Sequence, residues 1–261
     1  MDNKRLEQLF LTVQKPGRYS GGEMGSVIKN KDEVDVRFAF CFPDTYEIGM
    51  SHLGMKILYG LFNERDDIWC ERVFAPWLDF EEVMRRENIP LFALESRDRV
   101  SEFDFIGFTL QYELSYTNVL NMLDLAGLTL RSADRTELTP LVVAGGPCAC
   151  NPEPLADFVD LFFLGEGEEV DLEVIDLYKE YKAKGGNDKK EFLKLASKIE
   201  GVYVPSLYDV QYDEEGKISR YIPKEGAPER VQKRIMTDMD NSFYPKNIPV
   251  PFTEIVHDRA V

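Results

Sequence analysis

Five short, largely apolar runs constrain the fold of this chain more than any other feature. They are VRFAFCF at 36–42, IWCERVFA at 68–75, FDFIGFTL at 103–110, LVVAG at 141–145 and VDLFFLG at 159–165. Stretches with helical periodicity lie between them, at about 50–63, 78–87, 114–126 and 152–157, and another comes after residue 166. Apolar strands that alternate with helices are typical of a parallel sheet with right-handed crossovers. The pattern predicts an α/β fold, a flavodoxin-like doubly wound sheet of five parallel strands in the order 2-1-3-4-5.

The remaining segments divide the chain around this sheet. Residues 1–35 are interpreted as an N-terminal extension and residues 36–200 as a Rossmann-like domain. Residues 201–223 are interpreted as a small β-hairpin that turns at Asp213–Gly216. Residues 224–261 contain prolines and charges without a clear period, which is typical of a linker.

Two further elements are expected within the Rossmann-like domain. PLFALES at 90–96 can add a short strand before the third long one. After the fifth strand, Val170, Val174 and Tyr178 recur on one face of a predicted helix, and a second helix is expected from about residue 192.

The charge of the chain argues against two classes of partner. The 261 residues include 47 Asp and Glu against 31 Lys and Arg, a net charge of −16. Such a chain repels phosphate backbones and anionic membranes, so we expect no nucleic acid and no membrane partner. No apolar run approaches the roughly 18 residues of a membrane span. No N-terminal signal is visible either, and the expected location is cytoplasmic.

The metal-ligating residue types are few and scattered. The four cysteines are Cys41, Cys70, Cys148 and Cys150, and none of them forms a C-x-x-C pair. Cys148-x-Cys150 is too isolated to build a zinc or iron–sulfur site by itself. With only His52 and one other histidine, a histidine-rich centre is excluded. No metal ligand and no catalytic residue is predicted in this chain.

Ligands of open parallel sheets bind beyond the carboxyl ends of the strands, and four loops begin there. The first is PDTYEIGMSHLG, which starts at Pro43. Asp44 can cap the following helix, and Gly49 permits the close approach of a ligand. The spacing Asp44-x-Tyr46-x-x-Gly49 also matches a cofactor motif in which histidine replaces the tyrosine. From these residues alone, a binding loop and an ordinary capped turn both remain open.

The loop after the third strand is TLQYELSYTN. Thr109 and Gln111 can form hydrogen bonds with a ligand, and Tyr112 and Tyr116 can stack on one. The alternative is that both tyrosines belong to the core and that their hydroxyls have partners within the protein.

The last two loops are rich in glycine. In AGGPCACNPEP, Gly145 and Gly146 come directly after an apolar strand, so a planar ligand can lie on bare backbone, and Pro147 stiffens the rest of the loop. In LGEGEEV, the acidic residues begin a helix, where the helix dipole favours them. One of them, Glu166, is expected to face the cleft and to accept hydrogen bonds from ligand hydroxyls or amides. A structural Gly-Gly turn and a plain helix start are the alternatives.

Taken together, the four loops resemble one family. DTYEIG, IGFTLQYE, VVAGGPCACNPEP and LGEGEE occur in the order of the cobalamin-binding domains that precede the barrel of radical SAM proteins. Longer stretches such as RYSGGE, ERVFAPW and LQYELSYTNVLNMLDLAG are similar to one branch of these B12-binding-type Fe-S oxidoreductases. The resemblance implies that residues 36–200 form a cobalamin-binding-like domain. It also implies cofactor-binding roles for the residues of the four loops: Asp44, Tyr46, Gly49, Thr109, Gln111, Tyr112, Gly145, Gly146, Pro147 and Glu166.

Two departures from the family pattern alter the implied cofactor site. Tyr46 stands where the histidine that ligates cobalt from below is usual, and Gln111 stands where a leucine is usual. The resemblance therefore implies cobalamin bound base-off, without a histidine ligand.

The resemblance also implies a domain that this chain does not contain. The family's C-x-x-x-C-x-x-C loop, which holds a [4Fe-4S] cluster for cleavage of S-adenosylmethionine, is absent. TEIVHDRAV at 253–261 resembles the lead-in to the first strand of a radical SAM barrel. We therefore expect an N-terminal piece of a radical SAM enzyme, either truncated or encoded by a split gene. It should be inactive alone, with the barrel as its partner, and methyl transfer or a related radical modification as the activity of the whole.

Two other functions are compatible with the residues. In one, the Rossmann-like module has lost cobalamin and serves substrate recognition or protein interaction, with Tyr46, Gln111 and Tyr112 filling the former slot. In the other, Cys41 or Cys148 is the nucleophile of a stand-alone enzyme, although the sequence places no general base beside either.

Overall fold

The computed structural model describes residues 3–224, 226–240 and 242–250. Its central sheet has six strands in the order β2-β1-β3-β4-β5-β6, and a separate antiparallel pair is formed by β7 and β8. The strands are β1 Val36–Phe42, β2 Ile68–Phe74, β3 Phe105–Thr109, β4 Leu141–Gly145, β5 Leu161–Phe163, β6 Val202–Tyr203, β7 Tyr208–Tyr212 and β8 Ile218–Pro223. The predicted α/β fold and the order of its five parallel strands are confirmed.

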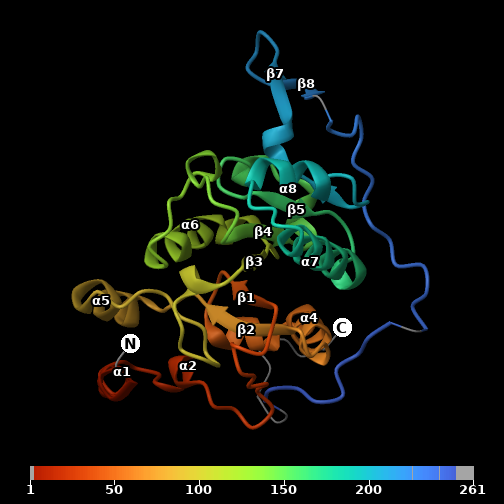
Figure 1. Ribbon diagram of the computed structural model, residues 1–261. Helices are drawn as coiled ribbons and strands as arrows, with labels where there is room; N and C mark the ends of the chain where they lie inside the picture. The colour runs from red at the N-terminus through yellow and green to blue at the C-terminus, as the bar shows by residue number, and fades with distance from the viewer. Residues whose placement is uncertain (1–2, 225, 241, 251–261) are drawn as a thin grey trace.

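Helices lie on both sides of this sheet (Figure 1). They are α1 Asn3–Phe10, α2 Gly17–Ser20, α3 Tyr46–Ser51, α4 Leu53–Glu64, α5 Leu78–Glu87, α6 Tyr116–Leu125, α7 Gly167–Ala183 and α8 Lys189–Ala196. Helices α4 and α7 pack beside each other on one side, while α5 and α6 lie on the other. All seven residues of β1 and all seven of β2 are buried, the charged Arg37, Glu71 and Arg72 included, as expected for strands covered on both faces.

One edge of the sheet differs from the prediction. Strands β1 to β5 pair in parallel, but β6 adds to β5 in the antiparallel direction, with Phe162 opposite Tyr203 and Phe163 opposite Val202. Two residues are too few to produce a recognisable strand pattern in the sequence. At 90–96 the expected strand is reduced to an isolated bridge between Phe92 and Arg99.

Two crossovers also differ from the predicted helices. The crossover after β1 begins at Tyr46 and is interrupted at His52, whose backbone is extended and whose N–H closes α3 by donating to the Gly49 carbonyl. The His52 ring packs against Phe42, with the ring centres 5.7 Å apart. At 152–157 only a 3-10 turn forms, Glu153–Leu155, because its prolines remove backbone donors.

The hairpin predicted within residues 201–223 is confirmed, since β7 pairs with β8. The segment after it returns along the protein and contacts the domain at several points (Figure 1). Arg234 N–H donates to the Leu164 carbonyl at 2.7 Å, and Gly25 N–H donates to the Pro249 carbonyl at 3.0 Å. The described part of the predicted linker is therefore packed against the domain. The expectation for 253–261 lies outside the described residues.

None of the helices within the described ranges is both long and apolar enough to cross a lipid bilayer.

Candidate functional site

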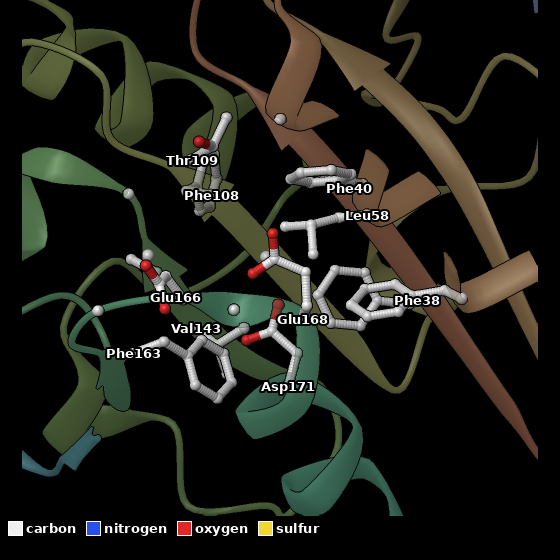
Figure 2. Close-up of a pocket in the computed structure, with 18 of the residues that line it drawn as sticks. Phe38, Phe40, Leu58, Phe108, Thr109, Val143, Phe163, Glu166, Glu168 and Asp171 are labelled. Carbon is white, nitrogen blue, oxygen red and sulfur yellow. The ribbon is translucent and has the colours of Figure 1, made fainter. Parts of the chain in front are cut away.

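A cavity of about 220 Å³ lies between the central sheet and the helices α4 and α7 (Figure 2). It is situated toward the carboxyl ends of β3, β4 and β5, since Thr109, Gly145 and Phe163 all contribute to its wall. This is the edge at which parallel sheets bind ligands. The cavity is smaller than a usual pocket for a whole small-molecule ligand, which is about 300–1,000 Å³. It therefore suits one group of a larger molecule.

Two glycines on adjacent strands line the cavity, and their surroundings differ. Gly107 lies in the middle of β3, and a Cβ atom added there would overlap the ring of Phe38. At Gly145 an added Cβ would meet only ordinary contacts, the nearest being Phe163 Cβ at 3.5 Å. The Phe38 ring thus fills the space above Gly107, whereas the backbone at Gly145 stays bare and a flat group has room to lie against it.

The walls of the cavity combine aromatic rings with acids (Figure 2). The rings of Phe40, Phe108 and Phe163 come from three different strands or strand ends. The titratable residues of the wall are all acidic and come from the start of α7 and the residue before it: Glu166, Glu168 and Asp171. Apolar rings with a few polar groups are typical of a site for a planar organic molecule.

Asp171 is the most unusual of these acids, and the sequence interpretation missed it. The residue is 6% exposed, and its Oδ1 atom has no hydrogen-bond partner among the described residues. Burial, and secondarily the charge of Glu168, raises its pKa well above the ordinary value of an aspartate. An available signal was its helical spacing, because Asp171 shares the buried face of α7 with Val174, Ile175 and Tyr178.

The structure brings five of the ten predicted site residues to this cavity: Thr109, Gln111, Gly145, Gly146 and Glu166. The Gln111 amide donates to the Thr109 hydroxyl at 2.5 Å, so the two polar side chains of the third-strand loop already bind each other. Gly146 has a φ of +95°, and an added Cβ would lie 2.9 Å from the Leu110 carbonyl oxygen. The absence of a side chain at Gly146 lets the loop after β4 approach the loop after β3 closely.

Glu166 connects the cavity with the returning C-terminal segment. Its carboxylate accepts a hydrogen bond from the backbone N–H of Met236, and its own N–H donates to the Arg234 carbonyl at 3.2 Å. The Arg234 side chain in turn binds Glu169 and Glu173 on α7. The mouth of the cavity is therefore bordered by the segment that comes after the hairpin.

The other five predicted residues lie outside the lining of this cavity within the described part of the chain: Asp44, Tyr46, Gly49, Tyr112 and Pro147. The Tyr112 hydroxyl donates to the Asp44 carboxylate, which joins the loops after β1 and β3. Burial, strengthened by that carboxylate, raises the pKa of Tyr112 to about 12. Asp44 also accepts from Thr45 N–H at 2.6 Å, and Thr45 rather than Asp44 is the N-cap of α3.

Tyr46 belongs to a buried polar network on its side of the sheet. Its hydroxyl donates to Glu23 Oε1 at 2.9 Å. Glu23 also accepts from the Arg72 guanidinium at 2.8 Å, and Arg72 binds Glu95 at 2.6 Å on its other side. Burial and the neighbouring Glu23 raise the pKa of the Tyr46 hydroxyl. The residue in the histidine position is thus held by the RYSGGE segment that the sequence resemblance included.

Gly49 and Pro147 have local structural roles. A Cβ atom added to Gly49 would overlap the ring of Phe74, so this glycine lets α3 lie against the end of β2. Pro147 is the first residue of the 3-10 turn Pro147–Cys150. A backbone N–H at that position would have no partner within the turn, so proline is tolerated there.

The cysteines offer no activated nucleophile among the described residues. Cys41 and Cys70 are buried, and burial raises the pKa of both thiols. Burial also raises the pKa of Cys148, which opposes formation of a thiolate. No cluster of three or more His, Cys, Asp or Glu side chains suited to a metal occurs in the described ranges.

Comparison with known proteins gives one family match and one relative for this chain. The family described as radical SAM proteins, N-terminal, matches residues 54–205, which is more than half of the chain. An uncharacterized protein of Methanocaldococcus jannaschii is 28% identical over 189 residues, covering 71% of this chain and 31% of that protein. The chain thus spans about a third of the length of this curated relative. No solved structure matches the chain.

Proposed function

The chain belongs to the family of N-terminal regions of radical SAM proteins, and on this premise we propose that it binds cobalamin for a radical SAM iron–sulfur enzyme. The observation that carries the proposal is the cavity at the carboxyl edge of the sheet, with bare backbone at Gly145 and aromatic rings around it. The whole protein's activity, methyl transfer or a related radical modification, is part of the same proposal. Its boundaries would be 36–200 for the cofactor domain and 224–261 for the segment toward the barrel.

The residues of the cavity fit one part of cobalamin well. In the base-off form, the nucleotide base leaves the cobalt and needs a separate place in the protein. That base is planar, aromatic and carries a ring nitrogen. A cavity of about 220 Å³ with Phe40, Phe108 and Phe163 in its walls offers stacking and edge contacts to such a group. The unpartnered oxygen of Asp171 offers a polar contact.

The loops around the cavity have distinct parts in this proposal. Gly145 and Gly146 would carry the flat part of the cofactor, and Thr109, Gln111 and Glu166 would bind its polar substituents. Asp44, Tyr46, Gly49, Tyr112 and Pro147 would fix the shapes of those loops through the contacts described above. Because the Tyr46 hydroxyl binds Glu23 at 2.9 Å, we expect it to leave the cobalt without a protein ligand from that position.

The chemistry of the proposed cofactors divides between two parts of the enzyme. Cobalamin would supply a carrier for a methyl group. The [4Fe-4S] cluster and S-adenosylmethionine would belong to a radical SAM barrel in the same protein or in a split partner. This chain has no C-x-x-x-C-x-x-C triplet to hold the cluster.

Hydroxocobalamin tests the proposal directly. The purified chain should shift the visible spectrum of hydroxocobalamin and retain it on gel filtration. Gly145→Val should abolish retention, because the new side chain fills part of the cavity wall while its Cβ atom meets only ordinary contacts, the nearest at 3.5 Å. Gly17→Val is the matched control, since Gly17 is exposed and has no heavy atom within 4 Å of its Cβ position. A wild-type chain that neither shifts the spectrum nor retains the cofactor would refute the proposal.

One observation favours a second function. The loops after β1 and β3 satisfy their polar groups internally, through Tyr46 with Glu23, Tyr112 with Asp44 and Gln111 with Thr109. Such loops suit a module that has lost its cofactor and that recognises the substrate or docks the barrel. In that case the barrel should bind this chain equally well with and without cobalamin, which a pull-down with the separately expressed barrel would measure.

A further inference from the structure

We propose that Asp171 is the recognition residue of the cavity, and that its carboxyl group forms one hydrogen bond with a ring nitrogen of a planar heteroaromatic base. The identity of that base as part of cobalamin rests on the function proposed above. The role of Asp171 toward a nitrogen heterocycle rests on the geometry of the cavity itself.

The position of Asp171 points to a ligand rather than to a structural role. Its side chain comes from the first turns of α7 and its carboxyl group lies at the cavity between Glu168 and the ring of Phe163 (Figure 2). Gly167 leaves space for that group, since an added Cβ would lie 2.9 Å from Asp171 Oδ2. The buried Oδ1 still has no hydrogen-bond partner in the described part of the protein.

Other fully buried acids of the protein have strong partners. Glu71 binds the Arg37 guanidinium at 2.5 Å, and Asp160 binds the Lys189 ammonium at 2.7 Å. Burying a carboxyl group without such a partner is costly, so native proteins rarely retain one without a function. The contrast points to a partner for Asp171 that lies outside the described part of the protein.

The charges around Asp171 determine the form in which it acts. On α7 it faces Glu168, and the loop before α7 contributes Glu166. The surfaces of α4 and the strands that line the cavity contribute apolar, glycine or neutral polar residues. With burial and the negative charge of Glu168 beside it, the pKa of Asp171 is raised well above its ordinary value, which favours the protonated carboxyl group. The O–H then donates to the lone pair of a ring nitrogen, and the proton remains on the oxygen.

The first test compares two corrinoids that differ in the nucleotide tail. Hydroxocobalamin contains the heteroaromatic base, and cobinamide lacks it. Asp171→Leu should lower the affinity for hydroxocobalamin about tenfold, which corresponds to the loss of one hydrogen bond. The affinity for cobinamide should stay unchanged. Asp171→Asn keeps an N–H donor and should restore most of the affinity. Glu180→Leu, at an exposed position on the same helix, is the matched control.

The outcomes separate the two proposals. If the wild type binds hydroxocobalamin and Asp171→Leu weakens both corrinoids equally or neither, the role of Asp171 is refuted while the proposed function stands. If the wild type binds neither corrinoid, the proposed function is refuted and a second measurement decides the role of Asp171.

That second measurement uses free benzimidazole and indene, two bicyclic molecules of the same shape, of which only benzimidazole has ring nitrogens. Ligand-observed NMR should detect benzimidazole binding to the wild type and to Asp171→Asn, with about tenfold weaker binding to Asp171→Leu. Indene should bind wild type and Asp171→Leu alike. No difference between benzimidazole and indene, or no binding of benzimidazole by the wild type, would overturn the proposal.

Discussion

Tyr46 and Asp171 lie at the same edge of the sheet, and they differ in whether their polar atoms have hydrogen-bond partners within the protein. The Tyr46 hydroxyl binds Glu23, which is itself bound to Arg72, so that side of the edge is closed by internal contacts. The Asp171 carboxyl group lies in a cavity with an oxygen that has no partner among the described residues. Both residues are partly or fully buried, and only one can offer a polar atom to a ligand without breaking an existing contact.

This difference shows how a binding edge can be divided between support and recognition. Groups that already have partners fix the shapes of the loops, and exchanging them should change stability more than ligand affinity. Groups without partners carry a cost in the free protein that a ligand can remove. Four variants test this division, from the largest expected effect to the smallest.

Arg72→Ala should have the largest effect on stability because it removes the cation from the buried network around Tyr46. Arg72 is 1% exposed and pairs with both Glu23 and Glu95, so its loss leaves buried carboxylates without a cation. We expect a loss of about 3–5 kcal/mol in the free energy of unfolding, measured by urea denaturation. Arg85→Ala is the control, because Arg85 also pairs with two acids but at the surface, and should cost about 1 kcal/mol or less. Equal losses for the two variants would contradict the distinction.

Gly107→Ala should affect the cavity that contains Asp171. The added methyl group would overlap the ring of Phe38, so that ring must shift, and both residues line the cavity. We expect a loss of about 1–3 kcal/mol in stability from overpacking. Hydroxocobalamin retention should fall as well. Gly17→Ala, where nothing lies within 4 Å, should change neither quantity. Full retention by Gly107→Ala would show that the cofactor does not use this cavity.

Asp171→Asn should stabilise the free protein in a pH-dependent manner. The pKa of Asp171 is raised in the folded state, so the native protein keeps a proton that the unfolded chain releases above its ordinary pKa of about 3.9. Stability due to this group is therefore lost as pH rises from that value toward the raised pKa. The variant should match wild type near pH 4 and exceed it by about 1–2 kcal/mol near pH 8. A pH-independent difference in thermal or urea unfolding would contradict an unpaired Asp171 with a raised pKa.

Tyr46→Phe should have the smallest effect. It removes one hydrogen bond to Glu23, which keeps its contacts with Arg72. We expect a loss of about 0.5–1.5 kcal/mol in stability and unchanged retention of hydroxocobalamin. Tyr212→Phe, at an exposed tyrosine, is the control. A large loss of retention with unchanged stability would instead assign Tyr46 to the cofactor.

Most of the central sheet is encoded in local sequence. The runs 36–42 and 141–145 became β1 and β4 with the same bounds, because continuous apolar residues are compatible with few positions other than a doubly covered strand. The prediction of a helix at 152–157 was wrong, because Pro152 and Pro154 disfavour a helix there despite the helical spacing of the apolar residues. Strand β6 depends on its pairing with β5, which no local pattern encodes.

The candidate site was predictable only in part for a similar reason. Glycines and polar residues directly after strands identified Gly145, Thr109 and Glu166 as neighbours at one edge, since parallel strands end together. Which of the loop residues would bind each other, as Tyr46 binds Glu23, depends on segments distant in the chain. Asp171 lay within a helix rather than a loop, where an acid is usually assigned to the solvated face.

The contacts of the returning C-terminal segment determine where an expression boundary can be drawn. Gly165, Gly60 and Gly25 each receive part of this segment so closely that a side chain would meet Arg234, Phe243 and Ile248. The family match ends at residue 205, before any of these three contacts can form. A chain cut at that residue would lose the contacts that cover these three glycines and would expose the surfaces around them to water. The smallest version of this protein suited to crystallisation or ligand screening therefore extends to at least residue 250.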